Sequence, residues 1–200
     1  MGTRTTQLPH PPRPKSWTKR DYNALIETGH LQKVLHGYLF RGQLIETCLP
    51  QHAYAVTVTN LTRALFKAFG TNEDYEIRIK LPFETPGESI PEPAAIVMPS
   101  GEIDRIPYPV HAQWIIEVSE NSLEIDHEKA REFAAAQVPE YWIIDVVARR
   151  LEVYRQILLD PSALLGYRYE SMALFHEEDP VRPLMQPNAT FRICDLLPPH

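Results

Sequence analysis

The sequence of 200 residues has few glycines, and it has no excess of positive charge. Its 8 glycines are outnumbered by 19 prolines, and none lies in a phosphate-binding pattern such as GxGxxG or GxxxxGK[ST]. The net charge of −6 provides no overall field that would attract DNA, RNA or an anionic membrane. A Gly-rich nucleotide-binding loop is therefore excluded, and a nucleic-acid partner would need a local basic patch.

Cysteine is also scarce, since only Cys48 and Cys194 are present and neither lies in a CxxC or CxxH pattern. This argues against a disulfide scaffold or a zinc site and fits a reducing compartment. No apolar run approaches the roughly 18 residues that a membrane span needs, and the N-terminus lacks an apolar signal core. We therefore expect a cytoplasmic protein. The patterns GxSxG and HExxH are absent too, so serine-hydrolase and zincin chemistry have no support.

Residues 1–20 are polar and rich in proline, which is typical of a loosely ordered leader. Residues 21–200 suffice for one domain core, because 44% of the whole chain is hydrophobic. The leader holds the candidates for a basic patch: Arg4, Arg13, Lys15, Lys19 and Arg20. We interpret this group as part of a solvated tail, and contact with nucleic acid is the alternative.

The clearest pattern lies in residues 113–155. QWIIEVS, residues 113–119, is an almost continuous apolar run and predicts a strand that is buried on both faces. Glu117 interrupts this run, and an unpaired charge there would cost several kcal/mol. The sequence therefore predicts that Glu117 is neutral, hydrogen-bonded, or held by a cation or a lysine.

A helix and two more strands follow this first strand. Ser122 and Asp126 supply helix-cap chemistry, and the helical pattern that follows ends at Pro139. YWIID and RRLEVYR predict strands, and a strand–helix–strand unit of this length joins parallel strands by a right-handed crossover. Lys129 lies at the margin of the apolar stripe of the helix, so we expect its ammonium near Glu117.

The flanking regions predict further elements. In chain order they are a helix at 21–31, a hairpin at 35–49, a helix at 52–69, strands at 75–83 and 94–98, and a strand pair after Pro161. The start of the 52–69 segment could alternatively be a strand. The Pro-rich arm at the C-terminus, with strand-like TFRI, is expected to wrap the edge of the sheet or a partner subunit. Periodicity alone supports no more than an α/β or α+β class.

The runs EVSENSLEID, EKA, VPEYWIID and RRLEVYR resemble the Uma-two family of putative restriction endonucleases, within the PD-(D/E)XK superfamily. The likeness extends more loosely from about Tyr22 to Leu197. It implies an α/β fold of the restriction-endonuclease type. This fold has an αβββαβ core and a mixed sheet flanked by helices, here with an added N-terminal hairpin and C-terminal strands. It also implies hydrolysis of DNA phosphodiesters assisted by Mg²⁺ or Mn²⁺.

The resemblance matches Glu117 to the family's catalytic and metal-binding Glu, and Lys129 to its catalytic Lys. Where the family has an Asp that binds the metal, this sequence has Ala94, which offers no side-chain oxygen. Glu92 lies two residues earlier and could partly replace that ligand. Tyr38 stands where the family often has an acid, and Lys129 follows Asp126 one residue sooner than expected. The expectation is a metal-dependent DNA endonuclease of weakened or lost activity.

Alternatives remain open at this stage. Glu117 and Lys129 could form a buried ion pair that fixes the strand register without chemistry. His52 and His127 could contact phosphate or metal, although capping or surface roles are the simpler interpretation, and we expect Asp145 to be a turn residue. For the whole chain the alternative is a non-catalytic scaffold that binds nucleic acid or protein. A homodimer is expected, because an open sheet leaves edges to cover.

Overall fold

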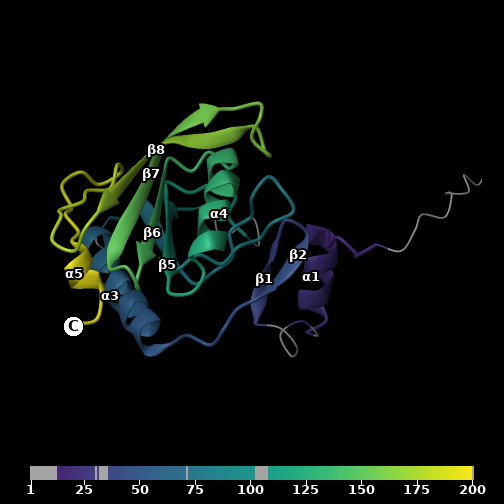
Figure 1. Ribbon diagram of the computed structural model, residues 1–200, viewed down its shortest axis with the longest axis horizontal. Helices are drawn as coiled ribbons and strands as arrows, with labels where there is room; N and C mark the ends of the chain where they lie inside the picture. Colours follow the sequence, from purple (N-terminus) through teal and green to yellow (C-terminus); the bar gives the residue numbers. More distant parts are fainter. Residues whose placement is uncertain (1–12, 30, 32–35, 71, 102–107, 200) are drawn as a thin grey trace, which may run out of the picture.

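The computed structural model describes residues 13–29, 31, 36–70, 72–101 and 108–199. Its elements follow one another as α1 (Lys19–Glu27), β1 (Gly37–Phe40), β2 (Gln43–Glu46), α3 (His52–Phe69), β3 (Tyr75–Ile79), β4 (Ala95–Pro99), β5 (Trp114–Ser119), α4 (Leu123–Ala135), β6 (Glu140–Asp145), β7 (Arg150–Leu159), β8 (Tyr167–Phe175) and α5 (Ile193–Leu196). Figure 1 shows α1 and the β1–β2 hairpin at one side of the molecule, apart from the large sheet.

Six strands form that sheet in the order β3-β4-β5-β6-β7-β8. Strands β5 and β6 are parallel, and every other neighbouring pair is antiparallel. The parallel pair is joined by α4, which is the expected crossover. The segment from α3 to β6 has the order αβββαβ, so the predicted fold class is confirmed. The predicted helix at 52–69 is also confirmed, including its doubtful start.

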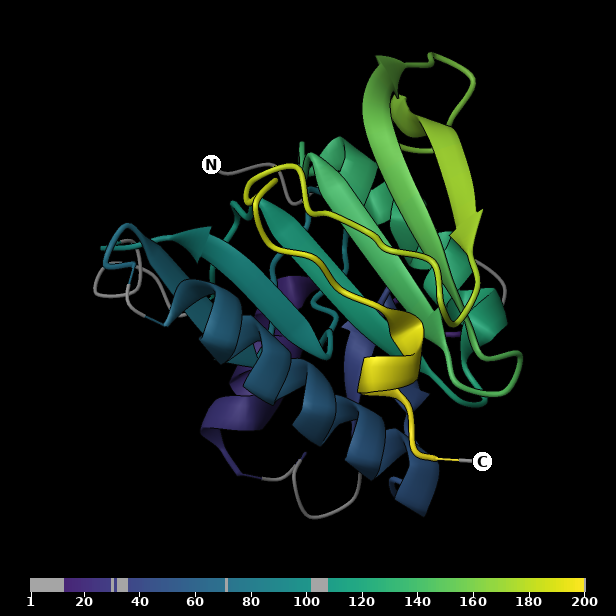
Figure 2. The same ribbon diagram turned by 90° about the vertical axis from the view of Figure 1, so that its left-hand side faces the viewer.

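The two faces of the sheet are covered by different elements. Trp114, Ile116 and Val118 of β5 point to the face on which α3 and the C-terminal segment pack. Ile115 and Glu117 point to the opposite face, which α4 covers. Figure 2 shows α3, the C-terminal segment and α5 in front of the sheet, with α4 behind it. The alternation that was read from the sequence therefore separates two layers of side chains.

A third and smaller core joins α1 to the hairpin. Tyr22, Leu39 and Ile90 are buried in it, and Leu25 and Ile26 pack against it. Helix α1 begins with a capping box, because the Thr18 hydroxyl accepts from the Asp21 N–H and the Asp21 side chain accepts from the Thr18 N–H. The helix thus starts two residues before its expected start. Most of the predicted leader, residues 1–12, lies outside the described residues.

Two predictions about the C-terminal region are wrong. The residues after Pro161 form one strand, β8, which pairs with β7, and not a strand pair of their own. The arm that follows packs on a face of the sheet and does not wrap its edge, whereas contact of the arm with a partner subunit stays a prediction. Phe191 from TFRI makes a single bridge to Val181 and packs on the rings of Trp114 and Trp142. Burial of these apolar side chains fixes the arm on the face that α3 also covers. In the described part of the chain no helix is long and apolar enough to cross a bilayer.

Candidate active site

The site is built around the carboxylate of Glu117, which β5 carries to the face beneath α4. Glu117 is only 4% exposed. Its Oε1 accepts a hydrogen bond from Nζ of Lys129 at 2.7 Å, which is the contact expected from the sequence. Lys129 is equally buried, and its stem crosses from the second turn of α4 to the sheet. The buried charge that interrupts the strand pattern is therefore compensated by one amine.

A second carboxylate, Asp126, shares the same ammonium. Nζ of Lys129 donates to Asp126 Oδ1 at 2.9 Å, and the hydroxyl of Ser122 donates to Asp126 Oδ2 at 2.6 Å. Asp126 is 1% exposed and belongs to the first turn of α4. From the sequence, Asp126 is expected only to supply helix-cap chemistry. The available signal was its spacing from Lys129, because residues three apart lie on one side of a helix.

One ammonium between two carboxylates leaves the cluster with an excess of negative charge. Burial raises the pKa of Glu117, Asp126 raises it further, and Lys129 opposes both effects. Burial alone would lower the pKa of Lys129, but Glu117 and Asp126 outweigh it and raise that pKa well above its ordinary value. The amine therefore stays protonated at neutral pH. An uncharged lysine that could act as a base is not available in this arrangement.

Tyr38 of β1 closes the site from the side of the hairpin. Nζ of Lys129 lies 4.7 Å from the centre of the Tyr38 ring, within the range of a cation–π contact. Burial raises the pKa of Tyr38 to about 12, so its phenol is neutral at physiological pH. The position at which the resemblance implies an acid is thus occupied by a neutral ring. This ring stabilises the ammonium without adding an oxygen ligand.

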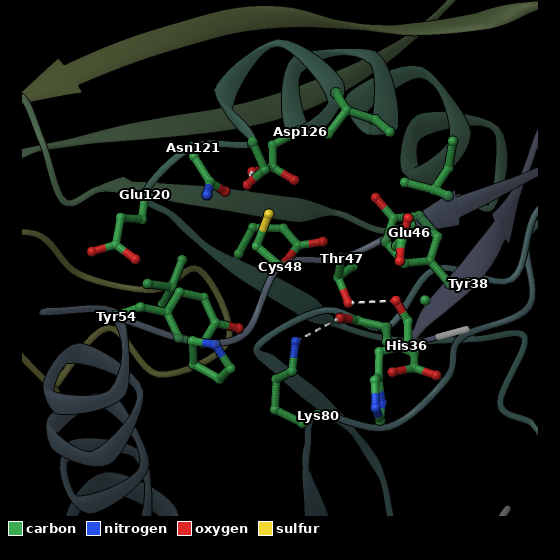
Figure 3. A pocket seen from close by; sticks show the side chains of 18 of the residues that line it. His36, Tyr38, Glu46, Thr47, Cys48, Tyr54, Lys80, Glu120, Asn121 and Asp126 are labelled. Atoms are coloured by element: carbon green, nitrogen blue, oxygen red, sulfur yellow. Dashed lines mark hydrogen bonds between the residues drawn. The ribbon is translucent and has the colours of Figure 1, made fainter. Parts of the chain in front are cut away.

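The cluster opens into a pocket of about 780 Å³. The hairpin and the segment after it line one side, and the end of β5 with the start of α4 lines the other. Figure 3 shows Tyr38 and Glu46 on the hairpin side, Asn121 and Asp126 on the helix side, and Tyr54 reaching in from α3. Other lining residues are His36, Thr47, Cys48, Lys80, Glu92, Glu117, Glu120, Ser122 and Lys129. Acidic side chains outnumber lysines in this lining.

Glu92, the predicted substitute ligand, lines the same pocket. It is half-buried, and burial raises its pKa against the opposing charges of Lys80 and Lys129. Nζ of Lys80 lies 3.5 Å from the backbone oxygen of Glu92, a contact drawn in Figure 3. The structure therefore brings Glu92, Glu117 and Lys129 together around one cavity, as expected. What each of them does there remains a prediction.

Ala94 occupies the position at which the resemblance implies the principal metal ligand. Its side chain has no exposed surface, and it belongs to the apolar cluster with Leu61 and Leu65 of α3. Its backbone oxygen accepts from the Lys80 N–H at 3.2 Å. The expected ligand position is thus filled by apolar packing.

These side chains do not fit a complete divalent cation site. Mg²⁺ takes about six oxygen ligands in octahedral geometry. Here one oxygen each of Glu117 and Asp126 already accepts from Lys129, and a metal ion would have to displace that ammonium. Across residues 13–101 and 108–199, apart from the gaps at 30, 32–35 and 71, no group of three or more His, Cys, Asp or Glu side chains is placed to hold a metal ion.

The remaining candidates from the sequence lie elsewhere. His127 does not line the pocket, and its Nε2 lies 2.7 Å from Oε2 of Glu152. His52 is exposed at the first residue of α3 and does not line the pocket. Asp145 accepts from the Ala148 N–H, as a turn residue does. Contact of either histidine with a ligand in the pocket therefore has no structural support.

The large rings of β5 and β6, and two of the basic candidates in the leader, are engaged within the fold. Trp114, Tyr141 and Trp142 are fully buried, so their rings fill the core and are not available to stack on bases. In the leader, Lys15 pairs with Asp21 at 3.4 Å, and Lys19 pairs with Glu84 at 3.0 Å. These lysines are compensated locally, which weakens the case for a basic patch at this end of the chain.

Comparisons with known proteins agree with this architecture. The family model Uma2, described as "Putative restriction endonuclease", matches residues 21–185. A crystal structure of a "putative nuclease belonging to DUF820" from Anabaena variabilis ATCC 29413 is similar in fold, with a TM-score of 0.65 and 14% sequence identity. The similarity covers 84% of this chain and 95% of that one. No curated protein matches the sequence.

Proposed function

Because the chain belongs to the Uma2 family of putative restriction endonucleases, we propose that it is a DNA endonuclease domain whose metal-dependent cleavage is weakened or lost. Family membership supports a nuclease-like function, and nucleases of this type generally use divalent metal ions. The ion, the DNA substrate and the loss of activity belong to the proposal. One observation carries it: Lys129 is bound by Glu117 and Asp126 together, with Ala94 at the expected ligand position.

In a working site of this kind, carboxylate oxygens would hold Mg²⁺ or Mn²⁺, and the ion would supply an activated water and screening of the phosphate charge. Glu117 and Glu92 are the residues that we propose for this role, and Lys129 is the residue that we propose to contact the phosphate. In the present arrangement the hydrogen bonds of Lys129 are directed to two carboxylates instead. The acidic lining of the pocket also repels a phosphate that has no cation beside it.

Cleavage of supercoiled plasmid and of single-stranded oligonucleotides in millimolar Mg²⁺ or Mn²⁺ tests the proposal. We expect slow cleavage or none from the wild type, and we expect Glu117→Gln to abolish any cleavage that is present. Glu124→Gln is the matched control, because Glu124 lies in the same turn as Asp126 but does not line the pocket. Rapid cleavage by the wild type, or cleavage that survives in Glu117→Gln, would overturn the assignment.

The variant Ala94→Asp tests whether the other residues of the site can still support cleavage. A new carboxylate at this position enters an apolar cluster, so we expect a stability cost of about 1–3 kcal/mol unless it finds a partner. Urea unfolding must therefore accompany the cleavage assay. Gain of cleavage in a folded Ala94→Asp protein, lost again when Glu117→Gln is added, would support the roles given above. A folded Ala94→Asp protein without cleavage would argue against them.

A non-catalytic binding module is the second candidate function. The same Lys129 pairing favours it, because buried carboxylates that are paired with a lysine can hold the fold without chemistry. DNA binding that is equal with and without divalent metal, together with absent cleavage in Ala94→Asp, would favour this candidate. The pocket would then act as a recognition surface.

A further inference from the structure

The large sheet ends in two edge strands that differ in their protection. Strand β3 is five residues long and carries Glu76 and Arg78. Strand β8 is nine residues long, and its second half, Ser-Met-Ala-Leu-Phe at 171–175, has no charge and no proline. Exposed edges usually carry charges, prolines or bulges, which prevent pairing with another chain. Strand β8 lacks these features where it is most apolar.

Side chains beside the β8 edge are also unusually exposed. Met172 is 55% exposed and Leu174 is 43% exposed. They lie opposite Tyr154 and Glu152 of β7, so both point to the same face of the sheet. Among the described residues, no segment pairs with the outer edge of β8, and the C-terminal arm crosses the sheet elsewhere. Backbone groups and apolar surface are therefore exposed together.

We propose that β8 pairs antiparallel with β8 of a second copy of this chain, with Ala173 on the twofold axis. This register places Met172 opposite Leu174 of the second copy, and Leu174 opposite its Met172, so the exposed apolar side chains cover one another. Ser171 then faces Phe175, and Glu170 faces His176. The edge is complementary to itself, as an interface between identical subunits requires.

Other symmetric registers fit less well. An axis at Ser171 places Glu170 opposite Met172, and an axis at Met172 places Glu170 opposite Leu174. An axis at Glu170 sets two like charges against each other. An axis at Tyr169 would pair Arg168 with Glu170, but Arg168 already binds Asp160 at 3.0 Å, and Met172 and Leu174 would stay uncovered. Of the five registers compared, only the one centred on Ala173 covers both apolar side chains without facing a charge toward them.

The main test compares association of the full-length wild type with Leu174→Lys by sedimentation velocity at micromolar concentrations. We expect a wild-type dimer and a monomeric Leu174→Lys, with association weakened about tenfold or more. Leu184→Lys is the matched control, because Leu184 is 53% exposed but lies in the C-terminal arm. It should remain dimeric. A wild type that is monomeric at every concentration, or a Leu174→Lys protein that stays dimeric, would overturn the proposal.

Oxidative crosslinking tests the register. In a background with Cys48→Ser and Cys194→Ser, Ala173→Cys should form a disulfide between copies. Directly opposed residues have Cα atoms about 4.5–5.5 Å apart, within the range that a disulfide spans. Ser171→Cys should not crosslink, since its counterpart would lie about four residues away along the strand. Equal crosslinking at both positions would contradict the register. The inference does not depend on the proposed nuclease function.

Discussion

The two faces of the large sheet are built from alternate residues of the same strands, yet they differ in chemistry. The face beneath α3 and the C-terminal arm is packed with rings, including Trp114 and Trp142 with centroids 4.4 Å apart. Its buried acid, Glu140, anchors the arm through the Leu184 N–H. The face beneath α4 instead holds Glu117 and Glu152 in its interior. The difference suggests that one face supplies stability, whereas the other keeps charges that only a partner can make tolerable.

Each buried acid of the α4 layer has such a partner. Glu117 and Asp126 bind Lys129, Glu132 binds Arg41 and Thr85, and Glu152 accepts from Tyr154 and lies beside His127 and Arg150. These pairs link α4 to the hairpin and to β5 and β7. The charged layer therefore determines how the elements around the pocket are placed relative to one another.

The largest effect is expected for Lys129→Met, which leaves Glu117 and Asp126 buried without their cation. The free energy of unfolding at neutral pH should fall by about 3–5 kcal/mol. This deficit should shrink as the pH falls to about 5, because burial favours protonated carboxyls and a neutral carboxyl needs no cation. Urea unfolding at the two pH values measures it. A deficit that does not depend on pH would mean that Lys129 contributes packing and not charge.

On the apolar face, Phe191→Ala should lower the free energy of unfolding by about 3 kcal/mol, because it removes a buried ring from the contacts with Trp114 and Trp142. Unlike that of Lys129→Met, this deficit should be the same at neutral pH and at about pH 5. Phe66→Ala is the control, since Phe66 is 53% exposed and should matter by less than about 0.5 kcal/mol. A pH-dependent deficit in Phe191→Ala would remove the distinction between the faces.

Arg41→Ala should have an intermediate effect of about 2 kcal/mol, because Glu132 is 1% exposed and would lose its guanidinium. Arg41 joins the hairpin to α4. The matched control is Arg131→Ala, which removes an exposed arginine that pairs with Glu128 at 3.5 Å. Its effect should stay below about 0.5 kcal/mol. Thermal or urea unfolding compares the two variants, and equal effects would show that the hairpin does not depend on this link.

The smallest effect concerns Tyr38, whose pKa burial raises to about 12 from 10.0. Because the pKa of Tyr38 is higher in the folded than in the unfolded protein, its contribution to the free energy of unfolding is fully present below pH 10. This contribution is lost as the pH rises through about 12. Tyr38→Phe lacks this loss. The free energy of unfolding of Tyr38→Phe, relative to that of the wild type, should therefore rise by about 1 kcal/mol between about pH 8 and about pH 11. Parallel pH profiles would mean that the Tyr38 hydroxyl is solvated and that the hairpin does not close over Lys129.

Local patterns predicted much of this structure. The alternation in β5 predicted that Glu117 points to the face opposite to that of Trp114, and the apolar stripe of the helix predicted that Lys129 lies near it. The contact between Glu117 and Lys129 therefore followed from periodicity. Asp126 was missed as a site residue because an acid in the first turn of a helix also serves as a cap. The Tyr38 ring meets Lys129 across 91 positions of sequence, and no local pattern encodes such a contact. Likewise, Phe191 is apolar, but the sequence around it does not specify which face of the large sheet it covers.

The central claim is that the Lys129 ammonium holds the carboxylates that a divalent cation would need. Calorimetric titration of Mn²⁺ into the wild type, Glu117→Gln and Lys129→Met tests it directly. In the wild type at millimolar Mn²⁺, we expect no heat of binding that Glu117→Gln would remove. In folded Lys129→Met, at a pH where its carboxylates are charged, we expect measurable binding. Wild-type binding that Glu117→Gln removes would contradict the claim, because the metal would then displace or coexist with the lysine.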